Sequence, residues 1–424
     1  MIQFLLKGLL RDRSRSLLPI IIITIGVMLT VLLTGYINGA YGDIIDQNAR
    51  FDTGHVKVMS KAYADNKDQI PNDLALLEVS PLIQKLGEDF PAMDWTKRIK
   101  FGGLVDVPDA TGNTKAQGPA MGMALDILSP NSKEVKRMRI QESLVTGTLP
   151  QQMGEVLIGH EFSEKLGLKL GEEITYFGTT MEGSMTFKSF KMVGTIQFGT
   201  PAMDKGAIII DVADAQLMLD MEDGAGEILG FLKGGVYQDT KAIDITQKFN
   251  KQYKNDADEY APMMQTLKQQ NGLGELIDMG ESMSSVFVFI FILTMSIVLW
   301  NTGLLGGLRR YKEFGIRLAL GEPKNKIYQR LIVEAVLIGL IGSFIGTVIG
   351  LGITYYIQIV GIDISSYLEN NTMILPSIIR SKVTPELFYI GFIPGVLAMV
   401  FGTMLAGIGI YKRETANLFK ELEV

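Results

Sequence analysis

RRYKEFGIRLALGEPKNKIYQRLIVEA, residues 309–335, is a basic stretch that lies between two long apolar runs. Its first part, 309–330, carries seven Lys or Arg residues and two Glu residues. Short loops rich in Lys and Arg stay on the cytoplasmic side of a membrane. The stretch therefore predicts a cytoplasmic loop between two membrane-spanning helices, and it orients the segments on either side of it.

Four apolar segments are long enough to cross a bilayer, in keeping with 47% hydrophobic residues in the chain. The first, 17–38, starts with 21 uncharged residues, and a helix of that length covers a hydrocarbon core of about 30 Å. The other three are 283–308, 331–359 and 387–411. A cleaved signal peptide is the alternative for the first segment, but its apolar run is long and no clear small-x-small cleavage site follows it.

The charge rule then assigns the remaining segments to the two sides of the membrane. Residues 1–16 predict an amphipathic helix on the cytoplasmic surface, with a disordered basic tail as the alternative, and 412–424 is a cytoplasmic tail. Residues 39–282 and the loop 360–386 lie outside. The predicted fold is an α-helical membrane protein with one plus three transmembrane helices and a large insertion after the first.

The insertion 39–282 shows mixed α/β patterning. Strands are predicted at HVKVM (55–59), at FKSFKMVGTIQF (187–198) and at GAIIID (206–211). Helical periodicity follows Ser80, surrounds His160 and starts again at Ala242.

The end of the insertion, 262–282, predicts a helical stalk that runs into the second span. Gly272 and Gly274 weaken that prediction, since each glycine costs a helix about 1 kcal/mol. A continuous helix transmits displacement, whereas a flexible linker does not.

Charge and composition exclude several classes of function. Residues 39–282 contain 24 basic and 36 acidic residues, an acidic balance that argues against nucleic acid as a partner. The chain has no cysteine, so disulfides and thiolate sites are excluded. The sequence also lacks a Gly-Lys pair, which a Walker A phosphate loop requires.

Catalytic and metal-binding motifs are equally weak. HEFSE (160–164) has Glu164 where a zinc peptidase needs its second histidine, and His55 is interpreted as a structural polar residue. We therefore expect no catalytic, cofactor or metal site in this chain. Any ATP hydrolysis is expected from another polypeptide.

The basic loop also carries an apolar pattern. Tyr311, Phe314 and Leu318 stand at positions i, i+3 and i+7 of a short helix. Gly321 followed by Pro323 predicts the end of that helix and the start of another. We interpret the ridge as a protein-docking element; the alternative is a solvated basic loop.

The span 331–359 contains a glycine ladder of Gly342, Gly346 and Gly350, four residues apart on one helix face. Such a ladder lets another helix approach closely. Two interpretations remain open at this point, a subunit interface or sliding seam and ordinary packing within one four-helix unit.

KEFGIRLALG, the basic turn and LIVEAVLIGLIGSFIGTVIG together resemble the signature of the FtsX-like permease domain. The resemblance extends to VLIGHEFSEKLGLKLGEEITYFG (156–178), which is similar to MacB-type periplasmic core domains, and to GHVKVMSKAY (54–63), which resembles the LolC/LolE lipoprotein-releasing branch. Glu322 and Pro323 depart from the small residues usual after the last glycine of the loop. The signature falls on these residues: Glu313, Gly315, Ile316, Ala319, Gly321, Glu334, Gly342, Gly346 and Gly350.

The resemblance implies the membrane (permease) subunit of an ABC transporter in the inner membrane. The outer domain would resemble MacB-type porter and sabre subdomains, and the subunit would pair with a second permease subunit, identical or not. The loop would be a coupling helix that docks on a separate cytoplasmic ATPase, which binds ATP with Mg. The coupling residues would be Tyr311, Glu313, Phe314, Gly315, Ile316, Leu318 and Gly321.

The resemblance further implies mechanotransmission, in which ATP-driven closure of the ATPases moves the outer domains. The favoured substrate is a lipoprotein or another amphipathic molecule, handled with membrane lipid and, in some members, a periplasmic chaperone or adaptor. The alternative is an FtsX-like regulator that transports nothing and activates a periplasmic cell-wall hydrolase. A membrane-anchored enzyme is the third class, and the missing motifs disfavour it.

Overall fold

The computed structural model describes residues 13–109, 111–199, 201–253, 258–308, 311–368 and 378–412. The chain divides into two compact units. The helical unit comprises residues 1–42, 279–362 and 379–424, and the α/β unit comprises 43–278 and 363–378. Predictions for 1–12 and for the tail from 413 lie outside the described residues.

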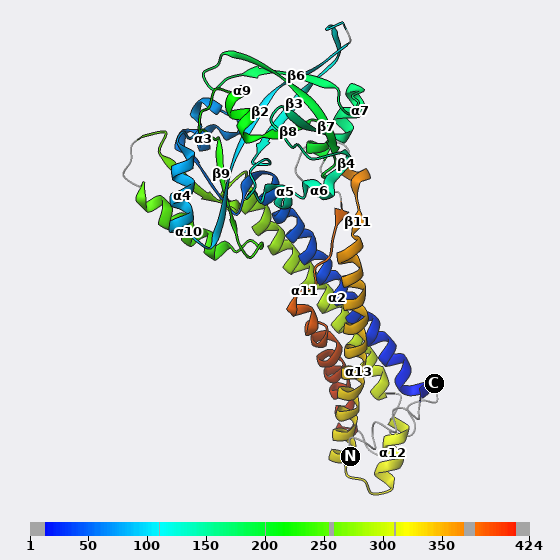
Figure 1. Cartoon of the computed structure of the whole chain (residues 1–424). Coiled ribbons are helices and arrows are strands. Elements are labelled where there is room, and N and C mark those ends of the chain that lie inside the picture. The colour runs from blue at the N-terminus through cyan, green and yellow to red at the C-terminus, as the bar shows by residue number, and fades with distance from the viewer. Residues whose placement is uncertain are drawn as a thin grey trace. The chain divides into compact units, whose positions relative to one another are not determined.

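The helical unit is built on long apolar helices (Figure 1). They are α2 (Arg13–Asn48), α11 (Leu273–Leu308) and α13 (Lys324–Val360). The last apolar segment consists of η5 (Pro385–Phe388), η6 (Ile393–Ala398) and α15 (Met399–Lys412). Within the described ranges, four stretches are long and apolar enough to cross a membrane, which confirms the one-plus-three arrangement.

Helices α2 and α11 extend well beyond their apolar segments. The apolar run predicted to end at residue 38 continues as helix to Asn48, and α11 starts ten residues before the predicted span, at Leu273. The predicted stalk is correct only from that point. Residues 262–266 form a strand instead, and Asn271 and Gly272 adopt positive φ values of 53° and 66° that break the chain before the helix.

The glycine ladder of α13 faces α2 of the same chain. A Cβ added at Gly346 would lie 2.6 Å from the Thr24 carbonyl oxygen and 2.9 Å from the Val27 Cβ. Gly342 and Gly350 make similarly close approaches to Ile23 and Val31. Packing within the four-helix unit therefore accounts for this ladder.

The α/β unit contains a four-stranded antiparallel sheet in the order β10-β1-β9-β2. Its strands are β10 (Pro262–Thr266), β1 (Val56–Ser60), β9 (Glu227–Leu232) and the first part of β2 (Met93–Pro108). Helices α4 (Val79–Asp89) and α10 (Asp239–Gln252) lie beside it (Figure 1). Apolar residues of both helices, including Leu86 and Phe249, join the core under the sheet.

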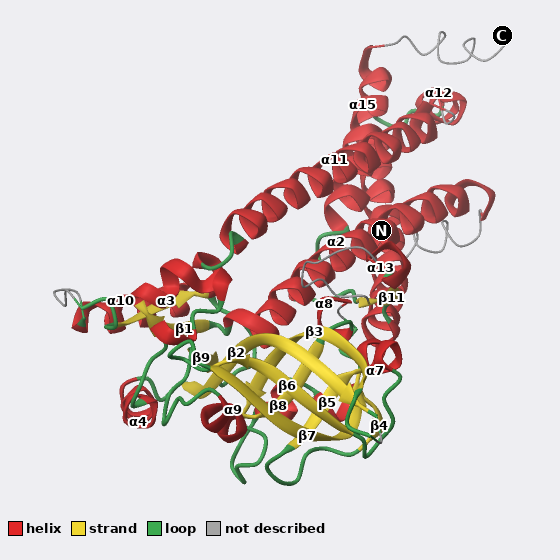
Figure 2. Ribbon diagram, turned by 90° about the horizontal axis from the view of Figure 1, so that it is seen from above, coloured by secondary structure: helices red, strands yellow, loops and turns green. Residues whose placement is uncertain are grey.

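The second half of β2 belongs to a closed barrel. The ring runs β2-β3-β8-β5-β7-β6 and back to β2, and Figure 2 shows these strands curving around one another. The added strands are β3 (Thr114–Leu125), β5 (Glu155–Gly159), β6 (Glu173–Thr179), β7 (Met185–Ile196) and β8 (Ala207–Asp211), with β4 (Leu144–Gly147) paired to the end of β7. Alternate side chains fill the interior, among them Phe101, Tyr176 and Phe190.

Short elements connect these parts. They are η1 (Ala49–Thr53), α3 (Lys61–Asn66), η2 (Lys67–Gln69), η3 (Asn72–Leu74), α5 (Glu134–Arg137), α6 (Ile140–Ser143), α7 (His160–Leu166), α8 (Pro201–Asp204), α9 (Val212–Met218), η4 (Leu267–Gln269), α12 (Tyr311–Ala319), β11 (Ile362–Asp363), α14 (Ser365–Leu368) and β12 (Ile378–Ile379). The three strands predicted from alternation correspond to β1, β7 and β8, which confirms the α/β assignment.

We predict that Gly346→Ala lowers the thermal unfolding midpoint of the helical unit, because the new methyl group meets α2 backbone at 2.6 Å. The measurement is Trp300 fluorescence of the full chain in lipid nanodiscs. Gly352→Ala on the same helix is the matched control, since an added Cβ there meets nothing within 4 Å. Equal midpoints for the two variants would show that the ladder is not tightly packed.

Candidate functional site

The basic loop folds as predicted into two helical pieces with a break. Helix α12 ends at Ala319, Gly321 takes a left-handed φ of 90°, and α13 starts at Lys324. The Glu322 amide donates to the Arg317 carbonyl at 3.0 Å, which caps the first helix. The Pro323 carbonyl accepts the first amide hydrogen bonds of α13, from Lys326 and Ile327.

The departure from the usual turn therefore has a structural explanation. Glu322 forms an ion pair with Arg330 across the turn, with 2.8 Å between their atoms. Pro323 adopts an extended conformation that suits the residue before a helix. Both residues stabilise the break rather than disturb it.

The apolar ridge of the loop does not point outward as we expected. Phe314 is only 2% exposed and packs with Ile327 and Leu331 of α13, and Leu318 joins the same small cluster. The expectation that these two side chains are held out into the cytoplasm was wrong, because they form the core that attaches α12 to α13. The side chain of Tyr311 lies outside the described residues.

Different apolar side chains of the loop are exposed. Ile316 is 52% exposed, and Leu320, just after the end of α12, is 83% exposed. On the same helix Glu313 and Arg317 form an i,i+4 ion pair of 2.7 Å. Ile316 and Leu320 are four residues apart and therefore lie on one face of the helix. We did not include Leu320 because we selected the other face, which Phe314 occupies.

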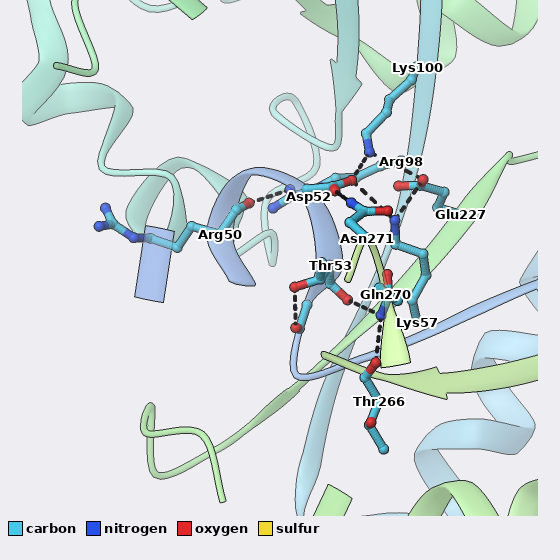
Figure 3. Close-up of polar contacts among 11 residues, drawn as sticks. Arg50, Asp52, Thr53, Lys57, Arg98, Lys100, Glu227, Thr266, Gln270 and Asn271 are labelled. Carbon is cyan, nitrogen blue, oxygen red and sulfur yellow. Dashed lines mark hydrogen bonds and ion pairs between the residues drawn. The ribbon is translucent and has the colours of Figure 1, made fainter. Parts of the chain in front are cut away.

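A second candidate site lies in the α/β unit, where the segments leading to α2 and α11 meet the sheet (Figure 3). Asp52 belongs to the π-helix that continues α2. The Lys57 ammonium lies 3.2 Å from Asp52 and 2.8 Å from Glu227. Lys100 pairs with the same two carboxylates, so two cations and two anions share one buried cluster.

The start of α11 is bonded to the same cluster. The Asn271 amide donates to the second carboxylate oxygen of Asp52. The Gln270 amide donates to the Thr53 carbonyl at 3.3 Å and to the Thr266 carbonyl at 3.1 Å. We name the residues Asp52, Lys57, Lys100, Glu227, Gln270 and Asn271 the polar junction, since they join two helix ends to strands β1, β2 and β9.

A neighbouring pair of arginines extends the polar junction. Arg98 is fully buried, donates to Glu134 at 2.8 Å and also donates to the Arg50 carbonyl in the π-helix that follows α2. Arg137 pairs with the same glutamate and lies 4.1 Å from the centre of the Phe231 ring. Apolar contacts among Ala49, Leu273 and Ile277 surround this region.

The charges in the polar junction control one another. Burial opposes ionisation of Asp52, but the ammonium groups of Lys100 and Lys57 outweigh it and hold the pKa of Asp52 well below its usual range. Burial likewise opposes the charge of Lys100, and Asp52 and Glu227 raise the pKa of Lys100 above its usual value. Asp52 and Lys100 are therefore both charged at neutral pH.

Two family models match the chain. One, described as the MacB-like periplasmic core domain, matches residues 16–247, which is more than half of the chain. The other, described as the FtsX-like permease C-terminal domain, matches 285–415 and includes the basic loop. The chain belongs to the FtsX/MacB-type family of ABC permeases.

Curated relatives are similar to the chain over part of their own length. The macrolide export ATP-binding/permease protein MacB of Acinetobacter baylyi is 20% identical over 417 residues, which cover 92% of this chain and 57% of that protein. MacB of Wolinella succinogenes is 39% identical over 72 residues, 17% of this chain and 11% of its own. The chain thus spans little more than half the length of the Acinetobacter baylyi protein, although the match covers most of the chain.

A solved structure is also similar to the chain. It is the periplasmic region of MacB from Actinobacillus actinomycetemcomitans, with 10% identity and a TM-score of 0.36. The match covers 52% of this chain and 92% of that one.

The FtsX/MacB-type signature did not point to the polar junction. The residues of the polar junction come from four separate parts of the chain. The charged ones stand in apolar or mixed segments, as Lys57 does in HVKVM and Glu227 does in GEILGF. A charged residue in an otherwise buried strand is the one signal that the sequence offered, because such residues are almost always paired.

We predict that Asp52→Asn lowers the free energy of unfolding of the α/β unit by about 3 kcal/mol, because it leaves an excess of buried positive charge. Denaturant titration of the full chain, followed by Trp95 fluorescence, measures the change. Asp244→Asn is the matched control, since Asp244 pairs with Lys248 on the exposed surface of α10 and should cost less than about 1 kcal/mol. A small effect of Asp52→Asn would exclude a tightly coupled cluster.

His55 provides a pH-dependent prediction. It is buried, its Nδ1 accepts a hydrogen bond from the Leu232 amide at 3.0 Å, and burial lowers its pKa to about 4. The unfolded chain takes up this proton near pH 6.5, so the free energy of unfolding should fall by up to about 3 kcal/mol as the pH drops from 6.5 to 4. Denaturant titrations at several pH values should show that the free energy of unfolding of His55→Gln depends less steeply on pH than that of the wild type. An equally steep dependence would contradict a neutral, buried His55.

Proposed function

We propose that this FtsX/MacB-type permease is the membrane subunit of an ABC transporter of the inner membrane, powered by a separate cytoplasmic ATPase. The observation that carries the proposal is the path of α11. This single helix starts at Leu273, two residues after Asn271 of the polar junction, and ends at Leu308, directly before the basic loop. A movement of the loop therefore has a continuous helix along which it can reach the α/β unit.

The contact with the ATPase is assigned to the exposed side of α12. Ile316 and Leu320 supply apolar area in a loop whose sequence is rich in Lys and Arg. Phe314 and Leu318 support this surface from behind by fixing α12 on α13. Glu313 pairs with Arg317 within α12, and Gly321 ends that helix. Ile316 is thus the signature residue that is assigned to docking, and Leu320 adds to it from outside the signature.

Mechanotransmission fits the way in which both long helices end. Helix α2 reaches the polar junction through Asp52, and α11 reaches it through Gln270 and Asn271. Buried paired charges resist separation, because breaking one pair leaves an uncompensated charge in a poorly solvated place. A pull on either helix would thus act on strands β1, β2 and β9 together.

The remaining components are proposed by similarity to the family. ATP with Mg would be bound by the ATPase, and a second permease subunit would complete the complex. The substrate would be a lipoprotein or another amphipathic molecule at the outer face of the membrane. The curated relatives are titled macrolide export proteins, which makes a small amphipathic molecule a further candidate beside a lipoprotein.

We predict that Leu320→Asp, alone and with Ile316→Asp, lowers recovery of the ATPase by at least about tenfold, because an interface hot spot contributes about 2 kcal/mol. The tagged chain is purified from its native membrane in mild detergent, and the ATPase is identified and quantified by mass spectrometry. Leu217→Asp serves as the control, since Leu217 is a leucine of the α/β unit that is 69% exposed.

Phe314→Asp separates docking from folding. It should destabilise the helical unit, because it places a charge in the cluster with Ile327 and Leu331. The Leu320 variant should instead keep the thermal midpoint of the wild type. Recovery of no ATPase with the wild type, or equal recovery with the Leu320 variants, would contradict the proposed function.

A further inference from the structure

We propose that the barrel carries a binding site for the polar head and the first part of the apolar chain of a cationic amphiphile. The inference deepens the proposed function and rests on it, because it assigns a substrate chemistry and a place to a permease for amphipathic molecules. It depends on two adjoining features of the barrel, an exposed apolar shelf and a polar cavity.

The apolar shelf consists of Leu104, Phe177, Met185 and Phe187 on the outside of strands β2, β6 and β7. The strand register places Leu104 opposite Phe177, and Phe177 opposite Phe187. The two phenylalanine rings lie 6.3 Å apart between their centres. Phe187 is 73% exposed and Met185 is 85% exposed, whereas the outer face of a sheet exposed to water is normally polar.

Polar rows border the shelf on one side. The next outward positions along the strands are Asp106, Thr175 and Ser189, which face one another in the same register. The change from apolar to polar within one residue pair indicates a bounded patch rather than a generally apolar surface. Contiguous apolar patches with a polar rim are typical of binding sites.

A polar cavity of about 730 Å³ adjoins the other side of the shelf. Gly102 and Thr179 line it, and each stands two residues from a shelf residue on the same face of its strand, Leu104 and Phe177 respectively. Met185 lies directly opposite Thr179 in the register. The shelf therefore leads into the cavity without an intervening row of side chains.

The cavity is suited to a polar head group with a positive charge. The amide residues Asn66, Gln69 and Asn72 line it, together with the acidic residues Asp73 and Glu182. Among the described residues that line it, none is a Lys, an Arg or a His.

The size of the site favours one small amphiphile over a protein partner. The cavity volume falls within the range of about 300–1,000 Å³ that is typical of small-molecule sites. Four exposed side chains present far less than the roughly 800 Å² per partner that a stable protein interface buries. The acidic balance of residues 39–282, with 24 basic and 36 acidic residues, also concentrates cations near the domain.

The test is photolabelling of the full chain in nanodiscs of zwitterionic lipid, without ATP or an ATPase. The probe is a trimethylammonium amphiphile with a diazirine in its twelve-carbon chain, compared with the same chain bearing a sulfate or a maltoside head. After digestion, mass spectrometry should locate saturable labelling in residues 66–74 and 173–196. The sulfate probe should label these peptides at least about fivefold less, since two carboxylates repel it.

Three variants sharpen the test. Gly102→Trp should reduce labelling by the ammonium probe at least about tenfold, because an added side chain enters open space and meets nothing within 4 Å at its Cβ. Asp73→Lys with Glu182→Lys should reverse the preference between the ammonium and sulfate probes. Leu217→Ser removes a leucine on α9 that is about as exposed as Phe187, and it should leave the labelling by all three probes unchanged.

Labelling confined to the membrane spans, equal labelling by all three probes or full labelling of Gly102→Trp would overturn the proposal. Absence of saturable labelling would also overturn it and would leave the shelf as a surface for a protein. The measurement needs no ATPase, so its failure is distinct from the failure of ATPase copurification, which concerns the proposed function alone.

Discussion

The α/β unit depends on one physical constraint, the mutual neutralisation of four charges, two of them buried and two partly buried. Asp52 and Glu227 each contact both Lys57 and Lys100, so no single residue can lose its charge without leaving the cluster unbalanced. Taking such groups out of water costs several kcal/mol per ion, and only their joint presence offsets this cost. The helix end and the neighbouring strands β1, β9 and β2 are consequently held at one spacing.

The same constraint explains why the π-helix follows α2. One extra residue per turn at Ala49–Thr53 changes which side chains face the sheet, and Asp52 is thereby brought to the two lysines. The Arg98 bond to the Arg50 carbonyl satisfies a backbone group at the same helix end, which an ordinary helix terminus would leave to water or a cap. The π-helix at this helix end is thus stabilised by specific polar partners, the two lysines and Arg98.

Periodicity and charge were sufficient to predict the parts of the fold that depend on local sequence. The spans, the helix–break–helix form of the loop and the strands at 55–59 and 206–211 follow from apolar length, turn residues and alternation. The loop break at Gly321 and Pro323 was predictable for the same reason. Membership of the FtsX/MacB-type family followed from a short motif with defined spacing.

The parts of the fold and of the site that depend on contacts between distant residues could not be predicted from the sequence. The ridge of Phe314 and Leu318 has the same periodicity whether it faces a partner protein or Ile327 and Leu331 of its own chain, and only the folded loop distinguishes these cases. The strand at Pro262–Thr266 exists because β1 offers it an edge, although its sequence PMMQT has no strong strand pattern. The polar junction unites residues that lie up to 219 positions apart, a distance over which local patterns carry no information.

Strand β2 has a consequence for how this protein can evolve. Its residues Met93–Arg98 pair with β9 in the sheet, and Ile99–Pro108 pair with β3 in the barrel, so one uninterrupted backbone belongs to both. The barrel is therefore not an appendage that recombination could exchange as a cassette at flexible linkers. New specificity must arise by substitution on the outside of its strands and by changes in the length of its turns, while the strand shared with the sheet stays fixed.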